Sequence, residues 1–167
     1  MFNILRLFIL FILLLPGNMD AQKVEKIDND QFFDLLDLKE DKLFIMNFWA
    51  TWCSPCVTEL PDFIKVSDEL SDKDIEFIFI NLDFPSQYES RLLPFMEKYN
   101  FKDKVYTLSE VNYNEWIPQV EEEWSGEIPS TLFFNNARNI YHFHSDAMNA
   151  DELRLTINNL LSEINHK

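Results

Sequence analysis

The chain contains few basic residues, few glycines and only two cysteines. Its 167 residues include 14 Lys and Arg against 29 Asp and Glu, which gives a net charge of −15. A charge of this sign repels phosphate backbones and anionic lipid headgroups, so the composition argues against a nucleic-acid-binding protein. Beyond residue 21 the only glycine is Gly126, and we find no repeat or linker. With 47% hydrophobic residues, the chain predicts one domain with a sizeable core.

Long hydrophobic runs are also missing. The N-terminal run Leu7 to Leu15 follows a single basic residue, Arg6, and ends before Pro16. This order is typical of a signal peptide, and the run is shorter than the roughly 20 residues that a membrane-spanning helix needs. We therefore predict a cleaved signal over residues 1–21 and a mature domain over 22–167, located in the periplasm or otherwise exported. The alternative is an uncleaved segment that anchors the protein weakly to a membrane.

The remaining sequence predicts alternating strands and helices. Two nearly continuous apolar runs, 42–50 and 75–83, are typical of buried strands, and the helical pattern from Cys53 to about Leu70 lies between them. Such a crossover makes the two strands parallel. A short turn joins two later strands, which should be antiparallel. The other predicted helices cover 28–38, 87–99, 113–122 and 149–164, the last with the apolar set Leu153, Leu155, Ile157, Leu160, Leu161 and Ile164, and the other strands cover 105–108, 131–134 and 141–145.

Both cysteines lie in the segment NFWATWCSPCVTELP, residues 47–61, where a strand gives way to a helix. A purely structural disulfide is one interpretation, but a four-residue loop would stabilise by only roughly 2 kcal/mol. The other interpretation is redox chemistry. Cys53 would lie at the helix N-terminus, where free N–H groups and the helix dipole favour a thiolate. Cys53 should therefore be the exposed attacking sulfur. Cys56, one turn further on and on the inner side, could then displace a substrate bound to Cys53.

The segment FWATWCSPC followed by Glu-Leu-Pro resembles the thioredoxin superfamily, and within it the exported TlpA-like disulfide reductases. The resemblance covers residues 24 to 164 in element order. It implies a three-layer α/β/α fold with a central mixed sheet, a redox-active Cys53–Cys56 dithiol and no cofactor. It also implies that Pro129 in GEIPST is a cis-proline facing the cysteines, and that the Ile128 backbone pairs with a substrate strand.

Two further side chains bear on mechanism. Cytoplasmic thioredoxins carry a buried Asp in the strand before the motif, whereas this chain has Asn47 there. Glu59 lies three residues after Cys56, hence on the same helix face, and TlpA-like proteins are similar in having Glu at this place. Burial would raise its pKa and let it exchange a proton with Cys56, whereas a solvated helix residue is the alternative.

The tryptophans flanking the motif also have two interpretations. Trp49 is expected in the core, and Trp52 is expected to form an apolar rim that contacts a docking polypeptide. The segment that contains Trp116 and Trp124 is expected to be core, with a docking surface as the alternative.

Three rival functions use the same residues. Copper binding or delivery would combine the two cysteines with His142 or His144, which share one face of a predicted strand. A peroxidase of the peroxiredoxin type would need Thr or Ser where this chain has Ala50. A non-catalytic binding module would keep the dithiol without turnover. We predict instead a thiol–disulfide oxidoreductase that reduces disulfide-containing envelope proteins and takes electrons from a separate membrane donor.

Overall fold

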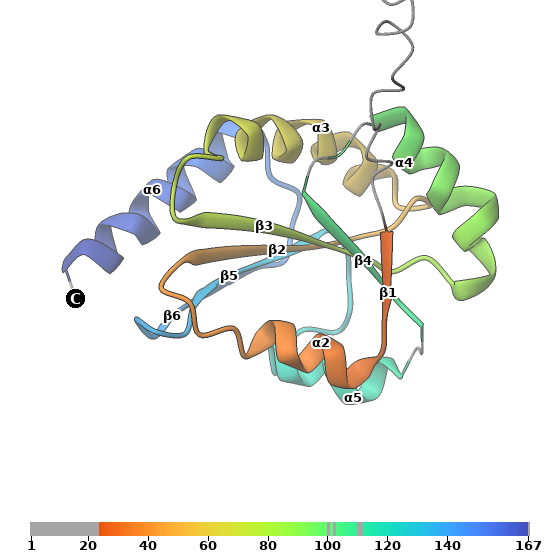
Figure 1. Ribbon diagram of the computed structural model, residues 1–167, viewed down its shortest axis with the longest axis horizontal. Helices are drawn as coiled ribbons and strands as arrows, with labels where there is room; N and C mark the ends of the chain where they lie inside the picture. Colours follow the sequence, from red (N-terminus) through yellow and green to blue (C-terminus); the bar gives the residue numbers. More distant parts are fainter. Residues whose placement is uncertain (1–23, 100, 102, 110–111, 167) are drawn as a thin grey trace, which may run out of the picture.

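The computed structural model describes residues 24–99, 101, 103–109 and 112–166, and a six-stranded sheet lies at its centre (Figure 1). The strand order is β1-β4-β3-β2-β5-β6. The strands are β1 Val24–Ile27, β2 Leu43–Trp49, β3 Ile75–Asn81, β4 Lys104–Leu108, β5 Ser130–Asn135 and β6 Ile140–His144. The helices are α2 Asn29–Leu36, α3 Ser54–Glu69, α4 Leu93–Tyr99, α5 Tyr113–Val120 and α6 Ala150–His166.

The sheet is mixed, as predicted. β1, β4, β3 and β2 run parallel to one another, whereas β5 is antiparallel to both β2 and β6. Helices α3, α4 and α6 cover one face and α2 and α5 cover the other (Figure 1). This arrangement confirms the three-layer thioredoxin-like architecture.

The central strand β2 explains why two helical layers are needed. All seven of its residues are buried, because apolar side chains point alternately to both faces of the sheet. The core toward α3 and α6 includes Ile45, Trp49, Leu60, Phe63, Phe79, Phe133, Leu153 and Ile157. The core toward α2 and α5 includes Phe32, Phe44, Phe48, Ile80, Trp116, Trp124, Leu132 and Phe134. Trp49, Trp116 and Trp124 are therefore core residues, and the alternative docking surface over Trp116 and Trp124 is wrong.

Side-chain caps define where the helices begin. Asp28 accepts a hydrogen bond from the Gln31 N–H while the Gln31 side chain accepts one from the Asp28 N–H, a reciprocal capping box for α2. Asn149 and Glu152 make the same exchange at the start of α6. These bonds satisfy N–H groups that have no partner inside a helix.

Three sequence expectations differ from the structure. Instead of one helix over 87–99, the structure has a 3₁₀ turn (Pro85–Gln87), a π turn (Tyr88–Leu92) and then α4. Strand β1 was not predicted, because only its two end residues are buried and it exists by pairing with β4. Leu155, assigned to the apolar side of the last helix, is 62% exposed because it falls on the solvent side of α6.

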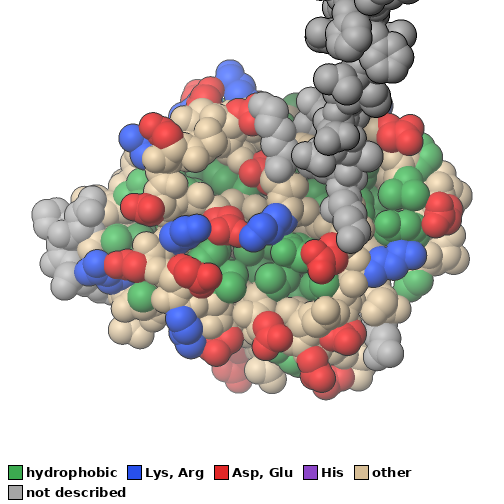
Figure 2. Space-filling view, viewed as in Figure 1, with side chains coloured by type: hydrophobic (Ala, Val, Ile, Leu, Met, Phe, Trp, Pro, Cys, Tyr) green, Lys and Arg blue, Asp and Glu red, His purple; other side chains and the backbone are tan. Residues whose placement is uncertain are grey.

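The surface carries the acidic excess, since acidic side chains are spread over the face in Figure 2 with Lys and Arg among them. Among the described residues, no helix is both long and apolar enough to cross a membrane. The predicted signal over 1–21 and the alternative anchor lie outside the described residues.

Candidate active site

The two cysteines lie at the junction of β2 and α3. Their sulfurs form a disulfide, with an S–S distance of 2.00 Å and Cα atoms 5.3 Å apart. Cys53 is the N-cap residue of α3, and Pro55 lies in the first turn, where its missing N–H needs no acceptor. The strand therefore ends and the helix begins at the cysteine pair.

The first turn of α3 places a donor at the Cys53 sulfur. The Cys56 N–H lies 3.2 Å from Cys53 Sγ. This N–H belongs to the free donors of a helix N-terminus, and together with the helix dipole it would stabilise negative charge on Cys53 after reduction. The same geometry leaves Cys56 one turn inside the helix, completely buried.

Exposure of Cys53 is much smaller than the sequence suggested. Cys53 is 5% exposed and Cys56 is 0% exposed, so Cys53 is the more exposed of the two as predicted, but the prediction of an exposed sulfur is wrong for this oxidised form. The reason is the loop before β5. The Ile128 carbonyl oxygen lies 3.6 Å from Cys53 Sγ, a van der Waals contact because an oxidised sulfur has no proton to donate.

The loop that carries Ile128 is fixed at several points. The Ile128–Pro129 peptide bond is cis, Ile128 is half-buried and Pro129 is buried. The Glu127 carbonyl accepts hydrogen bonds from Trp124 Nε1 at 2.8 Å and from the Ser130 hydroxyl at 2.8 Å. Gly126 precedes this turn with φ of 92°, a conformation that favours glycine. The two hydrogen bonds to the Glu127 carbonyl thus hold this loop opposite the disulfide.

Glu59 is buried behind the cysteines, which excludes the solvated alternative. It is 4% exposed, Asn47 Nδ2 donates to its Oε1 at 2.9 Å, and the Met148 N–H donates to its Oε2 at 2.9 Å. Desolvation raises the pKa of Glu59 to about 7; the two hydrogen bonds oppose this shift, and the charge of Asp146 adds to it. The carboxyl can therefore gain or lose a proton near neutral pH.

Asn47 connects this carboxyl to the sheet. It lies on β2, is fully buried, and uses its second Nδ2 hydrogen to donate to Thr131 Oγ1 on β5 at 3.1 Å. A neutral amide at this place supplies donors without adding a second buried charge. Sequence reasoning singled out Asn47 and Glu59 separately, whereas the structure joins them in one network that also includes Met148.

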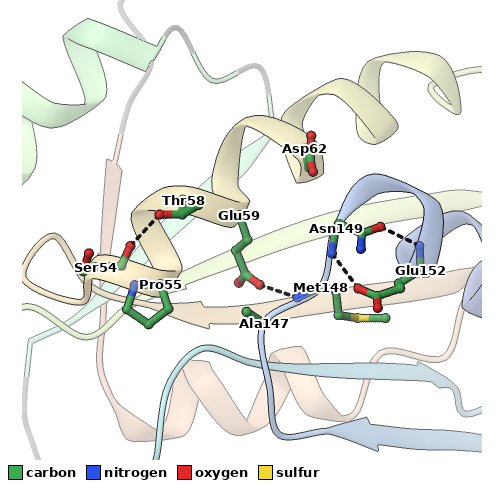
Figure 3. A pocket seen from close by; sticks show the side chains of 9 residues that line it. All are labelled: Ser54, Pro55, Thr58, Glu59, Asp62, Ala147, Met148, Asn149 and Glu152. Carbon is green, nitrogen blue, oxygen red and sulfur yellow. Dashed lines mark hydrogen bonds between the residues drawn. The ribbon is translucent and has the colours of Figure 1, made fainter.

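An open cleft of about 550 Å³ lies beside this network (Figure 3). In Figure 3 the Glu59 carboxylate points toward the loop that precedes α6. The cleft is lined by Ser54, Pro55, Thr58, Glu59, Asp62, Ala147, Met148, Asn149 and Glu152. Residues from between the two cysteines therefore border the same space as the buried carboxyl.

On the other side of the motif, a second buried carboxylate braces the loop. Asp83, which follows β3, is 4% exposed, and its Oδ1 accepts from the Thr51 N–H at 2.9 Å and from the Thr51 hydroxyl at 3.1 Å. Sequence reasoning did not single out Asp83. A carboxylate directly after a buried parallel strand was the signal that could have found it, since β2 ends at the same edge of the sheet.

The copper-binding and peroxidase alternatives depend on the histidines of β6 and on Ala50. Within the part of the chain that the structure describes, no three His, Cys, Asp or Glu side chains gather as metal ligands would. His142 lies on β6 and contacts the Phe133 ring, with centroids 5.8 Å apart. Ala50 is fully buried and offers no hydroxyl for a peroxide.

Known proteins resemble both the sequence and the fold. ResA, a thiol-disulfide oxidoreductase of Oceanobacillus iheyensis, is 37% identical over 68 residues, which are 41% of this chain and 34% of ResA. The chain spans 26% to 38% of the length of four such curated relatives.

Two solved structures share the fold. A thioredoxin-related protein from Neisseria meningitidis serogroup B has a TM-score of 0.64 and 20% identity, and covers 77% of this chain and 90% of its own. A secreted Mycobacterium tuberculosis disulfide oxidoreductase homologous to E. coli DsbE has a TM-score of 0.55 and 20% identity, over 71% of this chain and 82% of its own. These two structures confirm the predicted thioredoxin-like fold. The model of the AhpC/TSA family, a branch of the thioredoxin superfamily, matches residues 18–143, which are most of the chain, and the protein therefore belongs to the AhpC/TSA family.

Proposed function

We propose that the protein is an exported thiol–disulfide oxidoreductase that reduces disulfides of other proteins. The observation that carries this proposal is the Cys56 N–H 3.2 Å from Cys53 Sγ, at the start of α3 and opposite the Ile128–Pro129 turn. A thiolate needs this kind of stabilisation to attack at neutral pH. Kinship with ResA, which is named as a thiol-disulfide oxidoreductase, supports the same activity.

The reaction begins with the reduced protein. The Cys53 thiolate attacks one sulfur of a substrate disulfide, forms a mixed disulfide and releases the other substrate sulfur as a thiolate. Cys56 then loses its proton and attacks Cys53 Sγ, which forms the Cys53–Cys56 disulfide and releases the second substrate thiolate. Two electrons pass to the substrate, whose two thiolates take up two protons. The structure corresponds to the oxidised product of this cycle.

Glu59 is the proposed proton acceptor for Cys56. A buried thiol needs a nearby base before it can attack, and a carboxyl with a pKa of about 7 is matched to that task at neutral pH. It lies on the same helix face as Cys56, and the cleft beside Ser54 and Pro55 offers its proton a path to solvent. Trp52, 49% exposed, and the backbone of Ile128 with Pro129 are the proposed contacts for the substrate chain.

The remaining assignments concern location and electron supply. The signal-peptide pattern of residues 1–21, with 22–167 as the mature domain, supports export to the periplasm or another extracytosolic compartment. The relative from M. tuberculosis is described as secreted. Oxidised Cys53–Cys56 must be returned to the dithiol by a donor, and we propose a separate membrane protein for this step. An uncleaved N-terminus would hold the enzyme close to that donor.

The decisive experiment measures the reduction potential of the domain 22–167 against glutathione. A value below about −200 mV supports a reductase, whereas one near −120 mV makes the protein an oxidant. In parallel, Cys56→Ser should trap a mixed disulfide with substrate and Cys53→Ser should not. Absence of any exchange with protein disulfides would leave a non-catalytic binding module.

A further inference from the structure

Large exposed apolar side chains are few in the described residues, and two of them lie next to the active site. The four are Trp52, Phe84, Tyr141 and Leu155. Trp52 precedes Cys53 and is 49% exposed, while Phe84 is 52% exposed on the loop after β3. An isolated exposed apolar side chain needs no explanation. Two aromatic rings on adjoining loops beside a reactive sulfur are a different case.

The two loops are joined directly. Thr51 donates its N–H and its hydroxyl to Asp83 Oδ1, and Trp52 and Phe84 each follow one of these bonded residues. Burying a carboxylate is costly unless it is well bonded, yet Asp83 Oδ2 has no hydrogen-bond partner. The two hydrogen bonds of the buried Asp83 carboxylate therefore connect the loop that carries Phe84 to the loop that carries Trp52.

Two hydrogen bonds to Gln87 fix the backbone of Phe84. Its N–H donates to Gln87 Oε1 at 3.2 Å, and its carbonyl accepts from the Gln87 N–H at 2.7 Å. Pro85 follows, and a residue before proline is restricted to extended conformations such as φ −60° and ψ 144° at Phe84. An aromatic side chain on a fixed backbone has only two side-chain torsions to order on binding, which is a property of interface anchors.

We propose that Phe84 and Trp52 together form an apolar docking surface for the residue that flanks the target cysteine in a substrate polypeptide. This inference rests on the proposed function and adds a substrate preference to it. The occupant is an apolar side chain because the two exposed side chains on these joined loops, Trp52 and Phe84, are both aromatic. The acids on the opposite side, Asp62 and Glu152 in the cleft beside Pro55, disfavour an acidic neighbour there.

The test measures thiol–disulfide exchange between the reduced protein and two synthetic peptide disulfides, one with Leu and one with Ser beside the cysteine. The wild type should react about tenfold faster with the Leu peptide, the factor expected for partial burial of one apolar side chain. Phe84→Ala should lower the rate constant for the Leu peptide about fivefold. The ratio of the Leu-peptide to the Ser-peptide rate constant should then fall from about ten to about two. Phe84→Leu should restore most of that preference.

Leu155→Ala is the matched control, since Leu155 is also a large apolar side chain, 62% exposed, but lies on α6. It should retain both rate constants. Phe84→Ala removes no hydrogen-bonding group, so its fold should persist, and circular dichroism verifies this. If the wild type exchanges with both peptides but Phe84→Ala behaves like Leu155→Ala, the docking surface is wrong and the oxidoreductase stands. If the wild type exchanges with neither, the proposed function itself is wrong.

Discussion

Two buried carboxylates lie on opposite sides of the C-x-x-C motif, and each is 4% exposed. Glu59, on α3, accepts from the side chain of Asn47 and the N–H of Met148. Asp83, after β3, accepts both of its bonds from one residue, Thr51, on the loop that leads to Cys53. The two carboxylates are therefore equally buried but bonded to different parts of the site. We propose that the Glu59 carboxyl exchanges a proton with Cys56, whereas the Asp83 carboxylate holds the backbone of the loop that leads to Cys53.

The largest expected effect concerns stability against pH. Folded Glu59 keeps its proton up to about pH 7, whereas the unfolded chain releases it near 4.5. Between these values the folded state binds more protons, so the free energy of unfolding should fall as pH rises, by about 3 kcal/mol in all. Urea unfolding of wild type and Glu59→Gln between pH 4 and 8 measures the difference. Parallel profiles for the two proteins would contradict the raised pKa.

The next effect is kinetic. Glu59→Gln keeps the size of the side chain but removes its titrating group, and should slow attack of Cys56 on a mixed disulfide by about 100-fold. The rate profile should also lose its inflection near pH 7. Release of a chromophoric thiol from a preformed mixed disulfide on Cys53 reports this step. Glu69→Gln, on the same helix but exposed and paired with Arg154, is the control that should retain wild-type rates.

Asp83 should affect stability without moving that inflection. Asp83→Ala leaves the Thr51 N–H and hydroxyl without their acceptor and should lower the free energy of unfolding by about 2 kcal/mol. Asp83→Asn keeps an oxygen for these donors and should lower it by about 1 kcal/mol. Denaturant titrations give both values. If Asp83→Asn shifted the pH inflection of the exchange rate, both carboxylates would affect the ionisation of the thiols. The proposed difference between Asp83 and Glu59 would then be wrong.

The smallest expected effect distinguishes the two hydrogen bonds that Thr51 donates to Asp83, one from its N–H and one from its hydroxyl. Thr51→Val removes only the hydroxyl, so the bond from the backbone N–H to Asp83 remains. We expect a loss of about 0.5 to 1 kcal/mol in the free energy of unfolding. If Thr51→Val were as damaging as Asp83→Ala, the hydroxyl rather than the backbone would hold the loop.

Local patterns predicted most of the fold. Continuous apolar runs identified β2 and β3, and the helix between them made the pair parallel, because a crossover connection allows little else. Strand β1 was not predicted, because a four-residue strand with two buried positions is too short to show an alternating apolar pattern. The π turn at Tyr88–Leu92 likewise interrupts a sequence whose periodicity alone favours one helix.

The sequence by itself determined that two cysteines stand one helical turn apart at a strand-to-helix junction, with Glu59 three residues further along the same face. Spacing and local capping suffice for that. Only the tertiary structure decided that Cys53 is covered by Ile128, that Glu59 is enclosed by the loop before α6, and that Asp83 reaches Thr51. Those contacts join residues 32 to 89 positions apart, and burial depends on which distant segments cover a side chain.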